Sequence, residues 1–118
     1  WMANDSRLDL EKVVSYSEAE EYMKESNEKK AGGYGDWRIP TIHEASSIYD
    51  EEKLNKDFKD GDIYLDSVFP VGAANCTWTS STRGKEAQIF FYANGCPYWY
   101  EKNDKTISHA VRLVRRDN

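Results

Sequence analysis

Helix-type and strand-type patterns occupy separate halves of this 118-residue chain, and this separation limits its possible folds more than any other feature. Apolar residues recur at helical spacing before about residue 50, whereas Thr, Trp, Tyr, Phe and Ile gather from Cys76 onward. A parallel α/β sheet would need the two patterns to alternate along the chain. The length is that of one domain. We therefore expect a single α+β domain over residues 1–118.

Two helices are expected in the first half. The first is predicted over about Ser17–Lys30, where a hydroxyl and, three positions later, a carboxylate have the spacing of a capping box. A second capping box predicts a shorter helix over Thr41–Asp50. Between the helices, Trp37 and Ile39 alternate with Arg38, which is typical of a short extended segment.

The second half predicts an antiparallel sheet of about three or four strands. The predicted strands are Cys76–Ser81, Gln88–Asn94, Pro97–Tyr100 and Ala110–Arg115. A polar hairpin turn at residues 82–86 joins the first two, and Asn94-Gly95 is a strong turn signal before the third. We expect the last strand to close the sheet near the C-terminus. A short edge strand is also predicted over Trp1–Ser6.

The segment Glu51–Asp62 is charged and poor in apolar residues, so we expect a solvated loop there. Aspartates in and after this segment raise the alternative of a calcium site. Counting back from Gly61, however, places Lys56 and Phe58 at the first and third ligand positions of an EF-hand. We therefore expect no metal ion.

The overall charge narrows the range of partners. At a net charge of −5, the chain lacks the positive field that a nucleic-acid ligand requires. It contains no apolar run of about 18 residues, so no membrane-spanning helix is expected. The sequence begins at Trp1 and not at an initiator Met, as a processed or trimmed fragment would, so the missing signal peptide does not bear on export.

Motifs for catalysis are missing. The sequence has no GxSxG, HExxH or P-loop motif, and His43 and His109 are isolated. The two cysteines, Cys76 and Cys96, fit no zinc or thioredoxin spacing. One disulfide and two buried free thiols remain open as alternatives for this pair. We expect no cofactor and no enzymatic activity.

Three blocks occur in a fixed order, namely residues 36–41 (DWRIPT) followed by Glu44, residues 78–80 (WTS) and residues 111–115 (VRLVR). Together with Ala19 and Gly95, these blocks resemble the C-terminal domain family of the Legionella collagen-like adhesins. Ile39 stands where that family usually has leucine. The resemblance extends from about Val14 to Arg115.

This resemblance implies a C-type-lectin-like fold, with two helices packed on twisted antiparallel sheets. It also implies a ligand-binding domain of a secreted or cell-surface bacterial protein, which in some members binds sulfated polysaccharides. A sulfated polymer needs a basic face, which the net charge of this chain does not supply. Some members are thought to form trimers on a collagen-like stalk. The chain contains no stalk, so monomer and trimer both stay open.

We expect structural roles for the signature residues. They are Trp37, Arg38, Pro40, Glu44, Trp78, Arg112 and Arg115. The two tryptophans suit the core, and the first arginine is expected to form an ion pair with the glutamate. The last two arginines are expected to connect the final strand to the acidic helices.

Ligand binding is predicted on the hairpin and the aromatic run, because lectin-like folds bind ligands on loops and strand faces far from the helices. The predicted ligand-binding residues are Arg83, Lys85, Tyr92, Asn94, Tyr98, Trp99 and Tyr100. Strand alternation predicts Tyr98 and Tyr100 on one face and Trp99 on the other. The leading hypothesis is a non-catalytic module that binds a glycan or a protein. The alternatives are a structural or oligomerising cap of a larger surface protein, and an enzyme of the formylglycine-generating class with Cys76 or Cys96 reactive.

Overall fold

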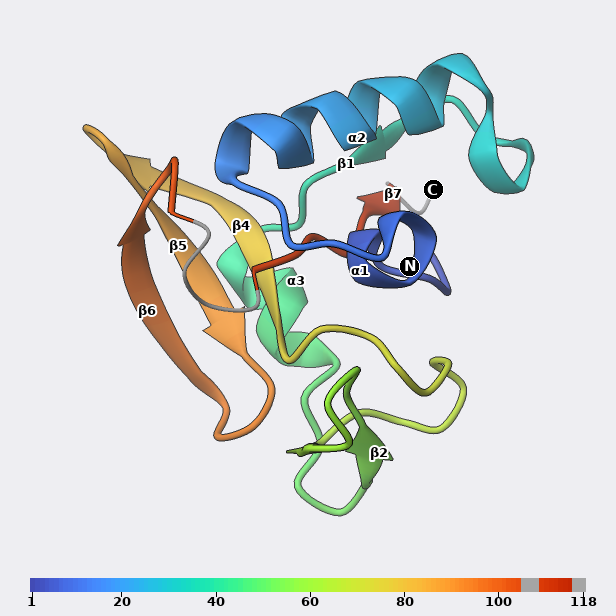
Figure 1. The fold of residues 1–118 in the computed structure, drawn as a ribbon, viewed down its shortest axis with the longest axis vertical. Helices are drawn as coiled ribbons and strands as arrows, with labels where there is room; N and C mark the ends of the chain where they lie inside the picture. The colour runs from blue at the N-terminus through green and yellow to red at the C-terminus, as the bar shows by residue number, and fades with distance from the viewer. Residues whose placement is uncertain (105–108, 116–118) are drawn as a thin grey trace.

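The computed structural model describes residues 1–104 and 109–115, and it shows a small α+β domain with antiparallel sheets, as predicted (Figure 1). The helical elements are α1 (Ser6–Leu10), α2 (Tyr16–Glu28), the 3-10 helix η1 (Ala31–Gly33) and α3 (Ile42–Ser47). The strands are β1 (Trp37–Arg38), β2 (Asn55–Lys56), β3 (Asp62–Ile63), β4 (Cys76–Arg83), β5 (Glu86–Phe91), β6 (Cys96–Glu101) and β7 (Val114–Arg115). The described residues include no helix whose length and apolarity would let it cross a membrane.

The largest sheet has the order β4-β5-β6, and its register decides which side chains share a face. Trp78 lies opposite Ile89, and Ile89 lies opposite Tyr98. Directly opposite residues point to the same face of an antiparallel sheet. Tyr98 therefore shares the Trp78 face, whereas its neighbour Trp99, which pairs with Gln88, points to the other face.

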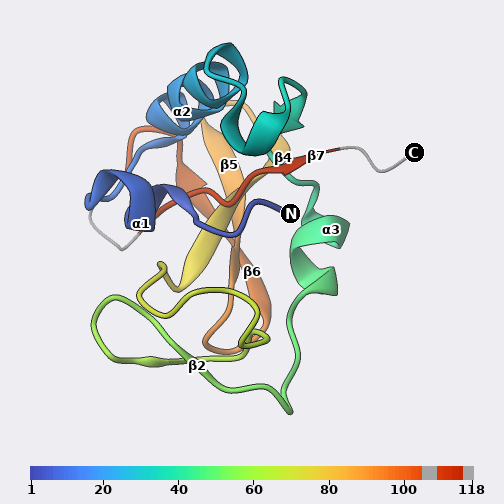
Figure 2. The ribbon, with the colours of Figure 1, turned by 90° about the vertical axis from the view of Figure 1, so that its right-hand side faces the viewer.

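Helices α2 and α3 lie on opposite sides of this sheet (Figure 2). Ala19 and Tyr22 of α2 pack with Trp78 in one buried cluster. Ala45 of α3 packs with Phe90 in a second cluster on the other face. The sheet is therefore the middle layer of a sandwich between helices, and each face contributes to its own core.

Helix α2 begins earlier than the sequence predicts. Its capping box is formed by Ser15 and Glu18, whose side chains each accept a hydrogen bond from the other residue's backbone N–H. The predicted box at Ser17 and Glu20 is wrong, although it has the same spacing. The register of α2 instead follows the burial of its apolar face, on which Ala19 is fully buried. The box at the start of α3 is present as predicted, but α3 ends at Ser47 and not near Asp50.

The two ends of the chain run together, which corrects two strand predictions. The backbone N–H of Met2 donates to the carbonyl of Leu113 at 2.9 Å, and that of Ser6 donates to Val111 at 2.9 Å. Only β7 is a strand in the predicted segment Ala110–Arg115, and it pairs with β1 instead of closing the main sheet. The predicted edge strand at residues 1–6 is not formed, and helix α1 follows in its place.

The predicted solvated loop at residues 51–62 contains a hairpin of β2 and β3. Asn55 and Asp57 are buried in it. The Asp57 carboxylate accepts hydrogen bonds from the backbone N–H groups of Lys59 and Gly61, so it stabilises the turn itself. No group of potential metal ligands occurs among residues 1–104 and 109–115.

Candidate functional site

The residues predicted to bind a ligand do not form one surface. The guanidinium of Arg83 lies over the Trp99 ring at 4.2 Å. Asn94 donates a hydrogen bond to the hydroxyl of Tyr98 at 2.8 Å. Because Tyr98 and Trp99 point to opposite faces of the sheet, these two pairs are separated by the sheet.

Tyr92 does not belong to the surface, which corrects the prediction for this residue. Its side chain is 1% exposed, and its hydroxyl donates to the carbonyl of Ala45 in α3 at 2.9 Å. Burial raises the pKa of Tyr92 above its ordinary value. Tyr92 follows the last residue of β5, and the turn directs its ring into the core beside Phe90. It therefore holds α3 to the sheet.

The remaining members of the predicted surface are divided between the core and the hairpin tip. The Tyr100 ring packs edge-on against the buried His109 ring, with centroids 4.7 Å apart. Lys85 lines a hollow of about 330 Å³ at the hairpin tip together with Lys102 and Glu101. Tyr100 and Lys85 therefore lie apart from the Arg83–Trp99 contact, and they extend neither that contact nor the Asn94–Tyr98 hydrogen bond into a common surface.

Neither Cys76 nor Cys96 forms a disulfide, which decides against the disulfide alternative left open by the sequence. Cys76 lies opposite Phe91, and Phe91 lies opposite Cys96, so a whole strand separates the two cysteines. Two strand spacings amount to about 10 Å, which is beyond the reach of a disulfide. Cys76 is buried, and burial raises the pKa of its thiol to about 12. Cys96 is exposed, so the second alternative, two buried thiols, holds only for Cys76.

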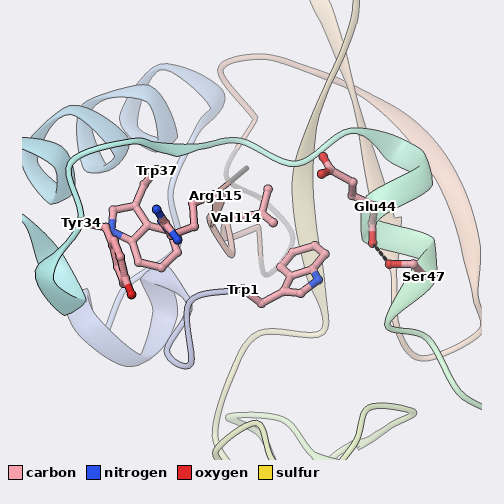
Figure 3. Close-up of a pocket in the computed structure, with 7 residues that line it drawn as sticks. All are labelled: Trp1, Tyr34, Trp37, Glu44, Ser47, Val114 and Arg115. Carbon is pink, nitrogen blue, oxygen red and sulfur yellow. Dashed lines mark hydrogen bonds between the residues drawn. The ribbon is translucent and has the colours of Figure 1, made fainter. Parts of the chain in front are cut away.

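A pocket of about 430 Å³ lies elsewhere, where the chain ends meet α3 (Figure 3). Its lining residues are Trp1, Tyr34, Trp37, Glu44, Ser47, Val114 and Arg115. Figure 3 shows Tyr34, Trp37 and Arg115 on one side, the polar side chains of α3 on the other, and Trp1 between them. The pocket therefore combines ring faces with hydrogen-bonding groups, as small-molecule sites commonly do.

One wall of the pocket depends on the pairing of β1 with β7. Trp37 lies opposite Arg115 in that ladder. The guanidinium of Arg115 lies 3.6 Å from the centroid of the Tyr34 ring, and its Nε donates to Asp36 at 2.9 Å. Arg115 is thus connected to the loop before β1.

Arg112, the other arginine of the closing segment, is buried. Its Nη1 donates to the main-chain carbonyls of Met2 and Ala3, and its guanidinium lies over Phe69. Burial lowers the pKa of Arg112, and the charge of Asp5, the N-cap of α1, opposes this shift. Arg112 therefore ties the closing segment to the start of the chain.

Trp37 is fixed from several sides. Its indole Nε1 donates to the carbonyl of Ala31 at 2.8 Å. The Asn27 side chain of α2 accepts from the backbone N–H of Trp37 and donates to its carbonyl. Because these bonds hold both the ring and the backbone, the aromatic wall is preorganised.

Glu44 on the opposite wall is held as a carboxylate. Arg38 donates to it through Nη1 at 2.6 Å and through Nη2 at 2.7 Å, which is the ion pair expected from the sequence. The hydrogen bonds from Arg38 are the largest cause that lowers the pKa of Glu44 to about 2. Glu44 can therefore accept hydrogen bonds at neutral pH, but it has no proton to donate.

Sequence reasoning missed four residues of the pocket and gave the other three a purely structural role. The four residues absent from the predicted site come from four separate segments, and they are Trp1, Tyr34, Ser47 and Val114. One local signal was present at Tyr34. This aromatic residue stands between Gly33 and Gly35, which have no side chains that could cover its ring. Its side chain is 46% exposed.

The chain was compared with known families and proteins. The family model described as the Lcl C-terminal domain matches residues 1–115. Neither a curated protein nor a solved structure gives a significant match. The family match extends over almost the entire sequence, including all the blocks on which the resemblance was based. The chain therefore belongs to the Lcl C-terminal domain family.

Proposed function

We propose that this chain is a non-catalytic binding module of a secreted or cell-surface bacterial protein, with a C-type-lectin-like fold and a glycan as its ligand. The glycan occupies the pocket between Tyr34 and α3. The observation that supports this most directly is the composition of the pocket, in which the rings of Trp1, Tyr34 and Trp37 line the same space as the polar side chains of α3 and Arg115 of β7. Aromatic rings pack against the apolar faces of sugar rings, and polar groups bind their hydroxyls.

The protonation states in and near the pocket favour binding over catalysis. A general acid must hold a proton at the working pH, and the lowered pKa of Glu44 prevents this. Cys76, a candidate nucleophile of the formylglycine-generating alternative, is buried as a neutral thiol because burial raises its pKa to about 12. Both observations support a module that binds without reacting.

A glycan and protein array, probed with and without calcium, tests this function. The best-binding glycan is then titrated against Tyr34→Ala, with Tyr98→Ala as the matched control, because Tyr98 is a similarly exposed tyrosine (39%) on β6. We expect Tyr34→Ala to weaken binding at least about tenfold and Tyr98→Ala to leave it within about twofold. A loss only in Tyr98→Ala would move the site to β6. Binding to proteins alone would overturn the glycan assignment.

A further inference from the structure

A second hollow, of about 420 Å³, adjoins the pocket. It shares Trp1, Tyr34 and Trp37 with the pocket, so the same aromatic side chains separate the two spaces. Its other wall comes from the start of the chain, α1 and η1. Of these, α1 lies on the side of the domain away from α3 (Figure 2). A ligand that extends over the shared rings would therefore enter both spaces.

The second hollow also offers hydrogen-bonding groups. Asn4 and Asp9 line it, and the Asn4 side chain donates to the Asp9 carboxylate at 3.1 Å. Asp9 also accepts from the hydroxyl of Tyr22, which fixes the orientation of the carboxylate. Gly32 lines the hollow without a side chain, so its main chain is accessible. These groups match the hydroxyls of a further sugar unit.

The charges around the two spaces do not favour an anion. Glu44 is paired with Arg38, and Arg115 is paired with Asp36. Asp9 adds a carboxylate to the second hollow, where no Lys or Arg is among the described lining residues. A sulfate or carboxylate group of a ligand would meet this negative charge without a matching cation.

We infer that the site takes an uncharged, chain-like saccharide, with one sugar unit in the pocket and the next in the second hollow. This inference rests on the proposed function and specifies its ligand class. The sugar chain crosses the edge formed by Tyr34 and Trp1, and Asn4 contacts the second unit. The length of the ligand and its lack of charge are therefore what the site recognises.

The test titrates the whole chain with cello-, chito- and malto-oligosaccharides, from the monosaccharide to the tetrasaccharide, and with a heparin tetrasaccharide as the sulfated comparison. We expect at least one neutral tetrasaccharide to bind about tenfold more tightly than its monosaccharide, and the heparin fragment to bind more weakly. Asn4→Ala should remove most of this tenfold advantage while leaving the monosaccharide affinity within about twofold. Ser47→Ala, a matched loss of one polar group in the pocket, should weaken both lengths equally.

Four results would overturn this inference. Equal affinity for all lengths would place the whole ligand in the pocket, and equal losses of both lengths in Asn4→Ala would remove the second contact. Tyr34-dependent binding of the heparin fragment alone would contradict the lack of charge but leave the proposed function standing. If no saccharide binds to a folded protein, the proposed function fails as well. Thermal unfolding of each variant confirms that it is folded.

Discussion

The guanidinium of Arg115 in β7 lies 3.6 Å from the centroid of the Tyr34 ring, so residues 81 positions apart form one wall of the pocket. Arg115 is held in this position by its ion pair with Asp36. The stack is therefore part of the wall before any ligand arrives. Its geometry depends on the planar shape of the guanidinium, which lysine does not have.

Replacing Arg115 by lysine tests the importance of that stack. Arg115→Lys keeps the positive charge near Asp36 but loses the planar contact with Tyr34, so we expect the glycan affinity to fall about fivefold. Isothermal titration measures the change. Arg83→Lys is the matched control, because Arg83 stacks on Trp99 in the same way outside the pocket. Equal losses in the two variants would contradict a specific role for the Tyr34 wall.

The ion pair between Arg38 and Glu44 predicts a pH dependence of stability. The folded-state pKa of Glu44, about 2, lies below its ordinary value of 4.5. The pair therefore stabilises the folded protein fully above about pH 4.5, and this contribution is lost as the pH falls toward 2. We expect Glu44→Gln to lower the free energy of unfolding by about 1 kcal/mol at pH 7, with a smaller difference at pH 3.

Urea unfolding of both proteins at several pH values measures this difference. Glu28→Gln, at an exposed position near the end of α2, should change the free energy of unfolding by less than about 0.5 kcal/mol at each pH. A Glu44→Gln effect that stays constant down to pH 2 would show that charge is not the cause.

Removing the Tyr92 hydroxyl should destabilise the fold without affecting binding. Tyr92→Phe leaves the buried carbonyl of Ala45 without this donor, at a cost of about 1–2 kcal/mol in the free energy of unfolding. Tyr98→Phe, at an exposed position, should cost less than about 0.5 kcal/mol. Denaturant unfolding checks both values. Comparable stabilities with a specific loss of binding in Tyr92→Phe would restore this residue to the binding surface.

Alanine substitutions at two turn glycines distinguish the free-energy cost of backbone strain from that of a steric clash. Gly84 and Gly95 both have positive φ, but a Cβ on Gly84 would meet nothing within 4 Å, whereas one on Gly95 would lie 2.7 Å from the Tyr49 ring. That ring is held edge-on by Tyr64 and Phe90, so it cannot simply move away. We expect Gly84→Ala to cost about 1 kcal/mol and Gly95→Ala about 3 kcal/mol.

The double variant Tyr49→Ala/Gly95→Ala provides the check on the clash. If the clash is the cause, Gly95→Ala should cost only about 1 kcal/mol when introduced into Tyr49→Ala. An unchanged cost of about 3 kcal/mol would assign the whole effect to the backbone.

The cysteines should differ in reactivity. A thiol reagent such as Ellman's reagent should label Cys96 rapidly in the native protein and should reach Cys76 only after unfolding, because Cys76 is buried and its pKa is raised to about 12. Cys96→Ser should therefore abolish the rapid native reaction. Absence of any reactive thiol in the unfolded, unreduced protein would reveal a disulfide instead.

The sequence predicted the features that depend on neighbouring residues. The box formed by Thr41 and Glu44 begins α3, and Gly95 adopts the positive φ expected of a turn. A capping hydroxyl bonds to a backbone N–H three residues away, and a turn glycine allows a positive φ at its own position. Both effects involve only neighbouring residues, so local sequence patterns can specify caps and turns. The succession of α2, α3 and the strands β4 to β6, and with it the α+β class, follows from the same kind of pattern.

Where two local patterns were equally good, only packing could decide between them. The boxes at Ser15 and at Ser17 have the same spacing, and the structure forms the first, with Val14 before the cap and Ala19 within the helix both packed in the cluster of Trp78. Likewise, the aromatic run did not reveal that Tyr92 is buried, because its burial depends on the position of Ala45 in another element.

The sequence by itself determined the cap of α3, the turn at Gly95 and the succession of α2, α3 and the strands β4 to β6, whereas the tertiary structure decided where the chain ends run and which side chains meet. Trp1, Tyr34, Ser47 and Arg115 share a pocket only because residues 1–6 run beside residues 111–113 and β7 pairs with β1. These are backbone pairings between segments far apart in the sequence. Their free energy depends on the burial of the whole core, so no local pattern specifies them.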